Sequence, residues 1–141
     1  MPEEDAVVVQ RSAWVEMAAH AQLEAPREAV GILGGAAFGV VDQIFPLTNI
    51  AGPLEFFADP YDQFQAERSI CMGGSIGVGY YHSHPGGGLN LSNSDRFFAQ
   101  RRDWVYLLLI TNLLGTRPVS GAAFRYIGEE LKRVSLVPQS F

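Results

Sequence analysis

The sequence predicts an α/β fold: a single domain in which a mixed central β-sheet is flanked by about three helices. Helical patterns alternate with short apolar segments bounded by glycine, which is typical of strands and helices built into one sheet. The chain has 141 residues, enough for one well-buried domain and too few for two ordinary ones. We therefore expect one domain over residues 1–141, with flexible ends at 1–7 and 138–141.

The composition is that of a globular protein without a membrane span. Apolar residues make up 48% of the chain and charged residues 18%. The longest dense apolar run, Trp104–Ile110, is far shorter than the roughly 20 residues of a membrane span, and Met1–Gln10 lacks the basic start of a signal peptide. The net charge is −5, and no basic stripe is present to bind phosphates. We predict a cytoplasmic protein that binds neither membranes nor nucleic acid.

The first predicted element is a helix that begins at Ser12 and ends before Pro26. Ser12 is a suitable N-cap, because its hydroxyl can accept a backbone hydrogen bond from the first turn. His20, near the end of this helix, is expected to be a polar surface residue and not a metal ligand. The apolar residues at helical spacing are Val15, Ala18, Ala19 and Leu23.

A hairpin is expected next. Ala29–Leu33 and Phe38–Leu47 are apolar runs separated by glycines, which predicts two strands joined near Gly34–Gly35.

A second helix is expected from Pro60 to about Met72, because Asp59 can cap it and proline is tolerated in a first turn. Cys71 lies seven residues after Phe64 on the same predicted face, which favours a buried small hydrophobe over a nucleophile. Most aromatic side chains near the start of this helix are expected in the core, with one or two available to line a substrate groove. These aromatic residues are Phe56, Phe57, Tyr61 and Phe64.

The second half of the chain predicts a buried strand, a helix and three closing strands. Gly73–Gly74 ends the second helix, and Ser75–Tyr81 has the composition of a strand that is buried on both faces. A third helix is expected over Ser92–Arg102. The closing strands are expected at Val105–Thr111, Ala122–Ile127 and Leu131–Val137.

A His-x-His pair follows the buried strand and predicts a metal site. If the strand continues, His82 and His84 project from the same face, because side chains repeat every two residues. Asp95, near the start of the third predicted helix, is the natural third ligand, since catalytic zinc sites combine three protein ligands with a water. A bare pair of histidines is commonly only a surface feature. Pro85 and the glycines of 86–88 favour a concave site instead.

Ser92 has two possible roles. Ser-x-x-Asp resembles a helix capping box, so a structural role at the start of the third predicted helix is reasonable. The hydroxyl could also donate to an oxyanion in the metal pocket. The two roles do not exclude each other.

These residues resemble the signature of the JAMM, or MPN-plus, family of zinc isopeptidases. That signature is a distant Glu, then His-x-His-Pro, six residues and Ser-x-x-Asp. The segment Glu28–Gly35 is similar to the strand that carries the distant Glu, and the resemblance covers roughly Val8–Val137. It implies an MPN, or cytidine-deaminase-like, architecture. The rest of the signature is reproduced at His82, His84, Pro85, Ser92 and Asp95.

The resemblance also implies roles for the residues. His82, His84 and Asp95 would hold one zinc ion with a catalytic water, Glu28 would act as the general base, and Ser92 would help to stabilise the oxyanion. The implied activity is that of a zinc metallopeptidase cleaving an amide or isopeptide bond at the C-terminal end of a ubiquitin-like or sulfur-carrier protein with a Gly-Gly tail. Two alternatives stay open, a non-catalytic binding scaffold and a hydrolase of free small peptides. The oligomeric state is not predicted.

Overall fold

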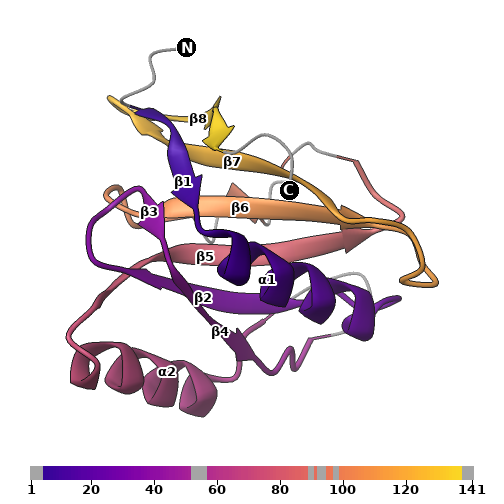
Figure 1. Ribbon diagram of the computed structural model, residues 1–141. Helices are drawn as coiled ribbons and strands as arrows, with labels where there is room; N and C mark the ends of the chain where they lie inside the picture. The colour runs from indigo at the N-terminus through magenta and orange to yellow at the C-terminus, as the bar shows by residue number, and fades with distance from the viewer. Residues whose placement is uncertain (1–4, 52–56, 89–90, 92–94, 97–98, 138–141) are drawn as a thin grey trace.

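The computed structural model describes residues 5–51, 57–88, 91, 95–96 and 99–137. Within these residues, two helices lie on opposite faces of a six-stranded sheet (Figure 1). In chain order the elements are β1 (Val7–Val9), α1 (Arg11–Glu24), β2 (Val30–Gly35), β3 (Val40–Val41), β4 (Gln43–Leu47), α2 (Pro60–Met72), β5 (Ile76–Pro85), β6 (Val105–Thr111), β7 (Ser120–Ile127), β8 (Glu130–Val134) and β9 (Leu136–Val137).

The large sheet has the strand order β4-β2-β5-β6-β7-β8. β5 and β6 run parallel, whereas the other neighbouring strands are antiparallel, so the sheet is mixed. β6 lies in the interior and is buried at nearly every position, as its apolar sequence predicts. The predicted α/β fold with a mixed central sheet is confirmed, as is the hairpin that pairs β2 with β4.

Successive residues of β2 show how the two helices are placed. Leu33 belongs to the core under α1, whereas Ile32 belongs to the core under α2. Because neighbouring side chains of a strand point to opposite faces, α1 and α2 cover opposite sides of the sheet. Val30 also faces α2 and pairs directly with His82, so the first histidine points to the α2 side.

α1 presents a different face to the core than the sequence pattern predicted. Its buried residues are Ala13, Trp14, Met17 and Ala21, whereas Val15 and Leu23 are exposed. Alanines occur on both sides of this helix, so the tryptophan and methionine decide which side packs. The predicted N-cap is also wrong: Gln10 occupies that position and makes no side-chain cap bond, while Ser12 lies inside the first turn.

α2 begins and ends as predicted, with the Asp59 carboxylate accepting a hydrogen bond from the Tyr61 N–H. The predicted burial of its other residues is wrong. Only Ala66 and Ile70 are buried, while Cys71 is exposed and so are Phe57, Tyr61 and Phe64. The helix packs near the edge of the sheet, where a narrow stripe is enough to cover β2 and β4. No helix in the described part of the chain is long and apolar enough to cross a membrane.

A second sheet, which was not predicted, contains three short parallel strands in the order β3-β1-β9. Val7 belongs to β1 and is fully buried, although residues 1–7 were expected to be flexible. The strands expected at Phe38–Leu47 and Leu131–Val137 are each divided between the two sheets. Such pairings join segments more than thirty positions apart (40 − 8 = 32 for Val8 and Val40), so no local pattern reveals them.

The third predicted helix does not extend to Arg102. Asp95 and Arg96 are helical, whereas residues 99–101 are not. The Tyr106 hydroxyl accepts from the Arg101 N–H and donates to the Arg101 carbonyl, which holds the segment as a turn against β6. Residues 92–94 and 97–98 of the prediction lie outside the described residues.

Candidate metal centre

Four side chains that could hold a metal ion gather on the α2 side of the sheet. Glu28, His82, His84 and Asp95 each offer a ligand atom, and these atoms lie within 4.8 Å of one another. Glu28, His82 and Asp95 are buried, and His84 is partly exposed. The structure thus brings together four of the five residues that the sequence singled out. The fifth, Ser92, lies outside the described residues.

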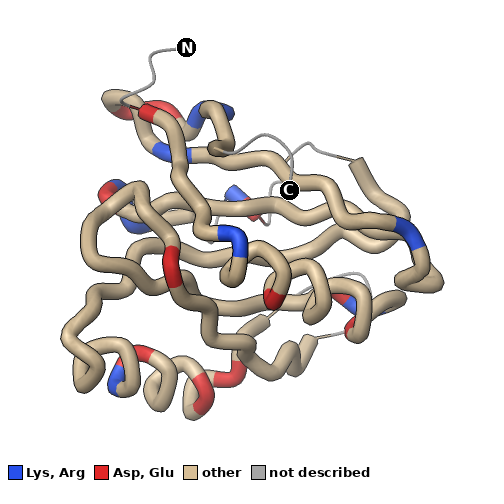
Figure 2. Tube along the Cα trace, in the orientation of Figure 1, with Lys and Arg blue, Asp and Glu red and all other residues tan. Residues whose placement is uncertain are grey.

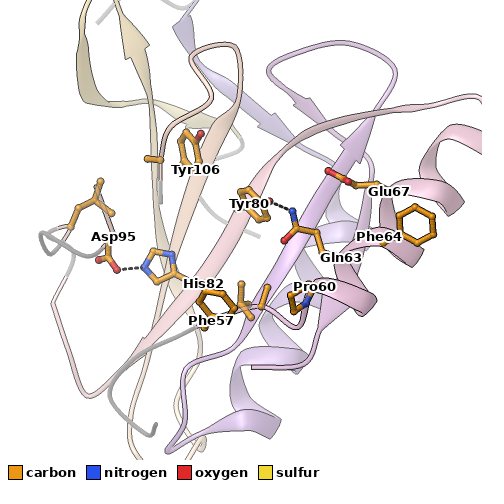
Figure 3. Close-up of a pocket in the computed structure, with 13 residues that line it drawn as sticks. Phe57, Pro60, Gln63, Phe64, Glu67, Tyr80, His82, Asp95 and Tyr106 are labelled. Carbon is orange, nitrogen blue, oxygen red and sulfur yellow. Dashed lines mark hydrogen bonds and ion pairs between the residues drawn. The ribbon is translucent and has the colours of Figure 1, made fainter. Parts of the chain in front are cut away.

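β5 supplies both imidazoles. The strand runs to Pro85, so His82 and His84 share a face, as predicted from their spacing. Their ring centroids are 5.0 Å apart. His82 Nε2 lies 3.1 Å from Asp95 Oδ1, and His84 Nε2 lies 3.1 Å from Asp95 Oδ2. Figure 3 shows the Asp95 carboxylate pointing at the His82 ring.

The pairing of β2 with β5 explains how Glu28 reaches the histidines across 54 positions (82 − 28 = 54). Val30 pairs with His82 in antiparallel register. Glu28, two residues before Val30, therefore lies opposite His84, two residues after His82. The backbone at this point is fixed from two sides. Ser83 Oγ accepts from the Ala29 N–H at 2.8 Å, and the Asn49 side-chain amide donates to the Glu28 carbonyl at 2.8 Å.

The pKa values of the two histidines shift in opposite directions because the surroundings of the two side chains differ. Burial lowers the pKa of His82, and the neighbouring Asp95 carboxylate offsets this only in part. Burial acts in the same direction on His84, but its bonds to Asp95 and Gly88 and the nearby carboxylates outweigh it, so the pKa of His84 is raised. A neutral His82 is the form that can ligate a metal ion.

The donor set fits a zinc ion. Two ligands of a tetrahedral zinc ion with bonds of about 2.0–2.1 Å lie roughly 3.3 Å apart, close to the 3.1 Å separations found between the imidazoles and the carboxylate. His84 Nδ1 lies 3.2 Å from the Gly88 carbonyl oxygen. A carbonyl only accepts, so Nδ1 carries the hydrogen and Nε2 is left for a metal, the arrangement that ligating histidines usually show.

The turn after Asp95 is fixed by two tyrosines that the sequence analysis did not single out. The Ala99 N–H donates to the Asp95 carbonyl, and the Tyr126 hydroxyl donates to the Ala99 carbonyl. The Tyr106 hydroxyl holds Arg101 in the same turn. Tyr106 and Tyr126 lie on different strands, so only the pairing of β6 with β7 reveals that both face this turn.

His20 is not part of the cluster, as predicted, but it is not a surface residue either. Its side chain is largely buried, and Nδ1 lies 2.7 Å from the Tyr81 hydroxyl. Tyr81 precedes His82 on β5 and points to the α1 face, so this pair supports the strand from the opposite side.

A cavity of about 300 Å³ adjoins the cluster (Figure 3). His82 and Asp95 form part of its wall, and α2 forms another part through Gln63, Phe64 and Glu67. Most of the lining is apolar. Phe57 and Phe64, which were expected mainly in the core, line this cavity instead.

Comparison with known protein families identifies the family of the chain. The model of a family described as prokaryotic homologues of the JAB domain matches residues 10–125. The chain belongs to this family. The predicted resemblance to JAMM, or MPN-plus, proteins is thereby confirmed, and the matched residues include Glu28, His82, His84 and Asp95.

Two solved structures are similar to the chain. Protein DSY2949 from Desulfitobacterium hafniense superimposes with a TM-score of 0.78 at 27% identity, over 93% of this chain and 91% of that one. A JAB1/MPN domain protein from Archaeoglobus fulgidus, AF2198, gives a TM-score of 0.60 at 18% identity, over 93% and 98% of the two chains. At this lower identity the likeness shows the fold alone.

A curated relative from Thermus thermophilus is named a probable TtuB-protein conjugate cleaving protease. It is 36% identical over 81 residues, which cover 56% of this chain and 53% of that protein. The match thus spans about half the length of this relative.

Proposed function

We propose that this JAB-family chain is a zinc-dependent hydrolase that cleaves an amide or isopeptide bond at the C-terminal end of a ubiquitin-like or sulfur-carrier protein with a Gly-Gly tail. The observation that carries the proposal is the cluster of two imidazoles and two carboxylates within 4.8 Å, beside a mostly apolar cavity. A buried cluster of this kind next to a pocket is a common form of hydrolytic metal site.

His82, His84 and Asp95 would hold the ion, as three ligands that leave one position for water. A bound zinc ion supplies Lewis acidity and lowers the pKa of its water to about 7. The Glu28 carboxylate accepts the proton of the attacking water and delivers it to the leaving amine. The Glu28 carboxylate is buried opposite His84 and lies within 4.8 Å of the other ligand atoms of the cluster, which supports this role.

Ser92 is proposed to donate a hydrogen bond to the oxygen of the scissile carbonyl as negative charge develops there. This role comes from the sequence motif, since Ser92 lies outside the described residues. A Ser92→Ala variant is expected to lower kcat by about 10²-fold or more and to leave zinc content unchanged.

The substrate class is supported by the name of the Thermus thermophilus relative, which refers to a protein conjugate. The cavity supports a peptide substrate, because its size is at the lower end of the range of about 300–1,000 Å³ for ligand pockets and suits side chains of an extended tail.

The proposal is tested with a ubiquitin-like carrier whose Gly-Gly tail is extended by two residues, and with the same carrier joined to a lysine side chain. The zinc-loaded chain is expected to release the extension or the lysine, as measured by mass spectrometry. Failure to bind zinc would favour the non-catalytic scaffold. Equal turnover of short model peptides and the folded carrier would favour the small-peptide hydrolase.

A further inference from the structure

The cavity beside the metal cluster extends along β5, from His82 toward Tyr80. Tyr80 and His82 both line it and lie two residues apart, so their side chains leave the same face of the strand about 6.5–7 Å apart. His84 and the opposing Glu28 do not line it and lie toward the other end of the strand. The cavity therefore extends from His82 away from Glu28, toward Tyr80 and α2.

This direction fixes which part of a substrate enters the cavity. In the proposed function Glu28 serves the leaving amine, so the amine lies at the Glu28 end and the acyl part of the substrate extends toward Tyr80. The last two residues of a Gly-Gly tail have no side chains, and in extended form they span about 6.5–7 Å. The first side chain that precedes them therefore comes to lie over Tyr80.

Two hydroxyl groups of the cavity wall, those of Tyr80 and Tyr106, are already hydrogen-bonded within the protein. The Gln63 side-chain amide donates to the Tyr80 hydroxyl at 2.7 Å, and the Tyr106 hydroxyl is bonded to Arg101. What faces the cavity is mainly carbon, from the Tyr80 ring and from residues such as Val30, Phe64 and Leu91. A mostly apolar wall favours an apolar ligand, because a polar side chain packed against it would lose its water without gaining a partner.

The Glu67 carboxylate makes the cavity unfavourable for an acidic side chain. Glu67 of α2 lines the cavity, and Figure 2 shows further acidic residues along this helix and at its start. A carboxylate in the tail would be repelled here as well as desolvated.

We propose that this cavity, lined by Tyr80, Phe64 and Glu67 beside His82 and Asp95, is a specificity site for a large apolar side chain immediately before the Gly-Gly of the substrate tail. The inference rests on the proposed function, because that function supplies the two glycines and the position of the leaving amine. The specificity site adds a requirement for the residue before the Gly-Gly, which the metal cluster alone does not impose.

The test uses the zinc-loaded chain and fluorogenic peptides acetyl-Ala-Xaa-Gly-Gly-aminomethylcoumarin, with Leu, Phe, Ala, Lys or Asp as Xaa. Leu and Phe are expected to exceed Ala by about 10- to 100-fold in kcat/KM, and Asp is expected to be poorest. Phe64→Ala should reduce the preference for Leu and Phe about tenfold, and Glu67→Gln should raise turnover of the Asp peptide. Tyr61→Ala is the matched control: it removes an equally exposed aromatic residue of the same helix that does not line the cavity.

Equal rates for Ala, Leu and Phe, or a preference for Lys over both, would overturn the specificity site while leaving the hydrolase intact. If no peptide is cleaved, the proposed function is in question and the cavity is tested by binding instead. Fluorescein-labelled Ala-Xaa-Gly-Gly with a free carboxylate is then titrated by fluorescence polarisation. Tighter binding of Leu and Phe than of Ala, reduced by Phe64→Ala but not by Tyr61→Ala, supports the site, and equal binding refutes it.

Discussion

Removal of the Ser83 hydroxyl should loosen the junction of β2 and β5 beside the metal cluster. Ser83 is fully buried, and its Oγ accepts the Ala29 N–H, next to Glu28. In Ser83→Ala this N–H loses its partner in a place that bulk water does not reach. An unsatisfied buried donor costs about 1–3 kcal/mol, whereas the small void left by one oxygen adds little. The free energy of unfolding should fall by that amount, and Tm by roughly 3–10 °C.

The assay is urea unfolding of the metal-free chain, followed by tryptophan fluorescence and by circular dichroism. Ser69→Ala is the matched control, because it makes the same chemical change at an exposed position of α2 and should alter stability by less than about 0.5 kcal/mol. The same Ser83→Ala chain should bind zinc more weakly, since the strands that present Glu28 and the histidines lose a connection. An unfolding free energy within about 0.3 kcal/mol of wild type would show that the Ala29 N–H does not depend on Ser83 for its hydrogen bond.

Three further predictions follow from the same structure. In Gly31→Ala the new Cβ would lie 2.2 Å from Tyr81 Cε1, far inside the normal contact of about 3.5–4.0 Å, so thermal unfolding should show a loss of about 1–3 kcal/mol. Gly88→Ala should show no loss, because among the described residues no atom other than those of its chain neighbours lies within 4 Å of the new Cβ. Burial lowers the pKa of His20, so the unfolded chain binds the His20 proton at a higher pH than the folded chain. The free energy of unfolding should therefore fall as the pH drops below 6.5. Urea titrations across pH should show that His20→Gln lacks this part of the pH dependence. Free zinc at 100 times its Kd should raise the free energy of unfolding by about 2.7 kcal/mol, an increase that chelation with EDTA should abolish and that Asp95→Ala should lack.

The strands of the large sheet could be predicted because their local pattern matches their environment. β6 is a continuous apolar run and is buried at nearly every position, and β5 carries the histidines at the spacing that places both on one face. The position of Glu28 could not be derived from any local pattern. It depends on the register of β2 against β5, which only the family signature could supply from sequence.

The errors concern features that are decided by tertiary packing. Cys71 and Phe64 share a helix face by spacing, but α2 packs by a narrow stripe and leaves both exposed. β1 was missed because its partners, β3 and β9, come from distant parts of the chain. The third predicted helix stops short because the Tyr106 hydroxyl bonds both backbone groups of Arg101, a contact that no helical pattern reveals.

The rate at which the zinc-loaded Glu28→Gln variant cleaves the extended Gly-Gly carrier shows whether this metal cluster performs hydrolysis with Glu28 moving the proton. Glutamine is close in shape to glutamate but cannot accept the proton. We predict that the variant retains one zinc ion per chain and cleaves about 10²- to 10⁴-fold more slowly than wild type. A variant that carries zinc and cleaves as fast as wild type would show that Glu28 does not move the proton.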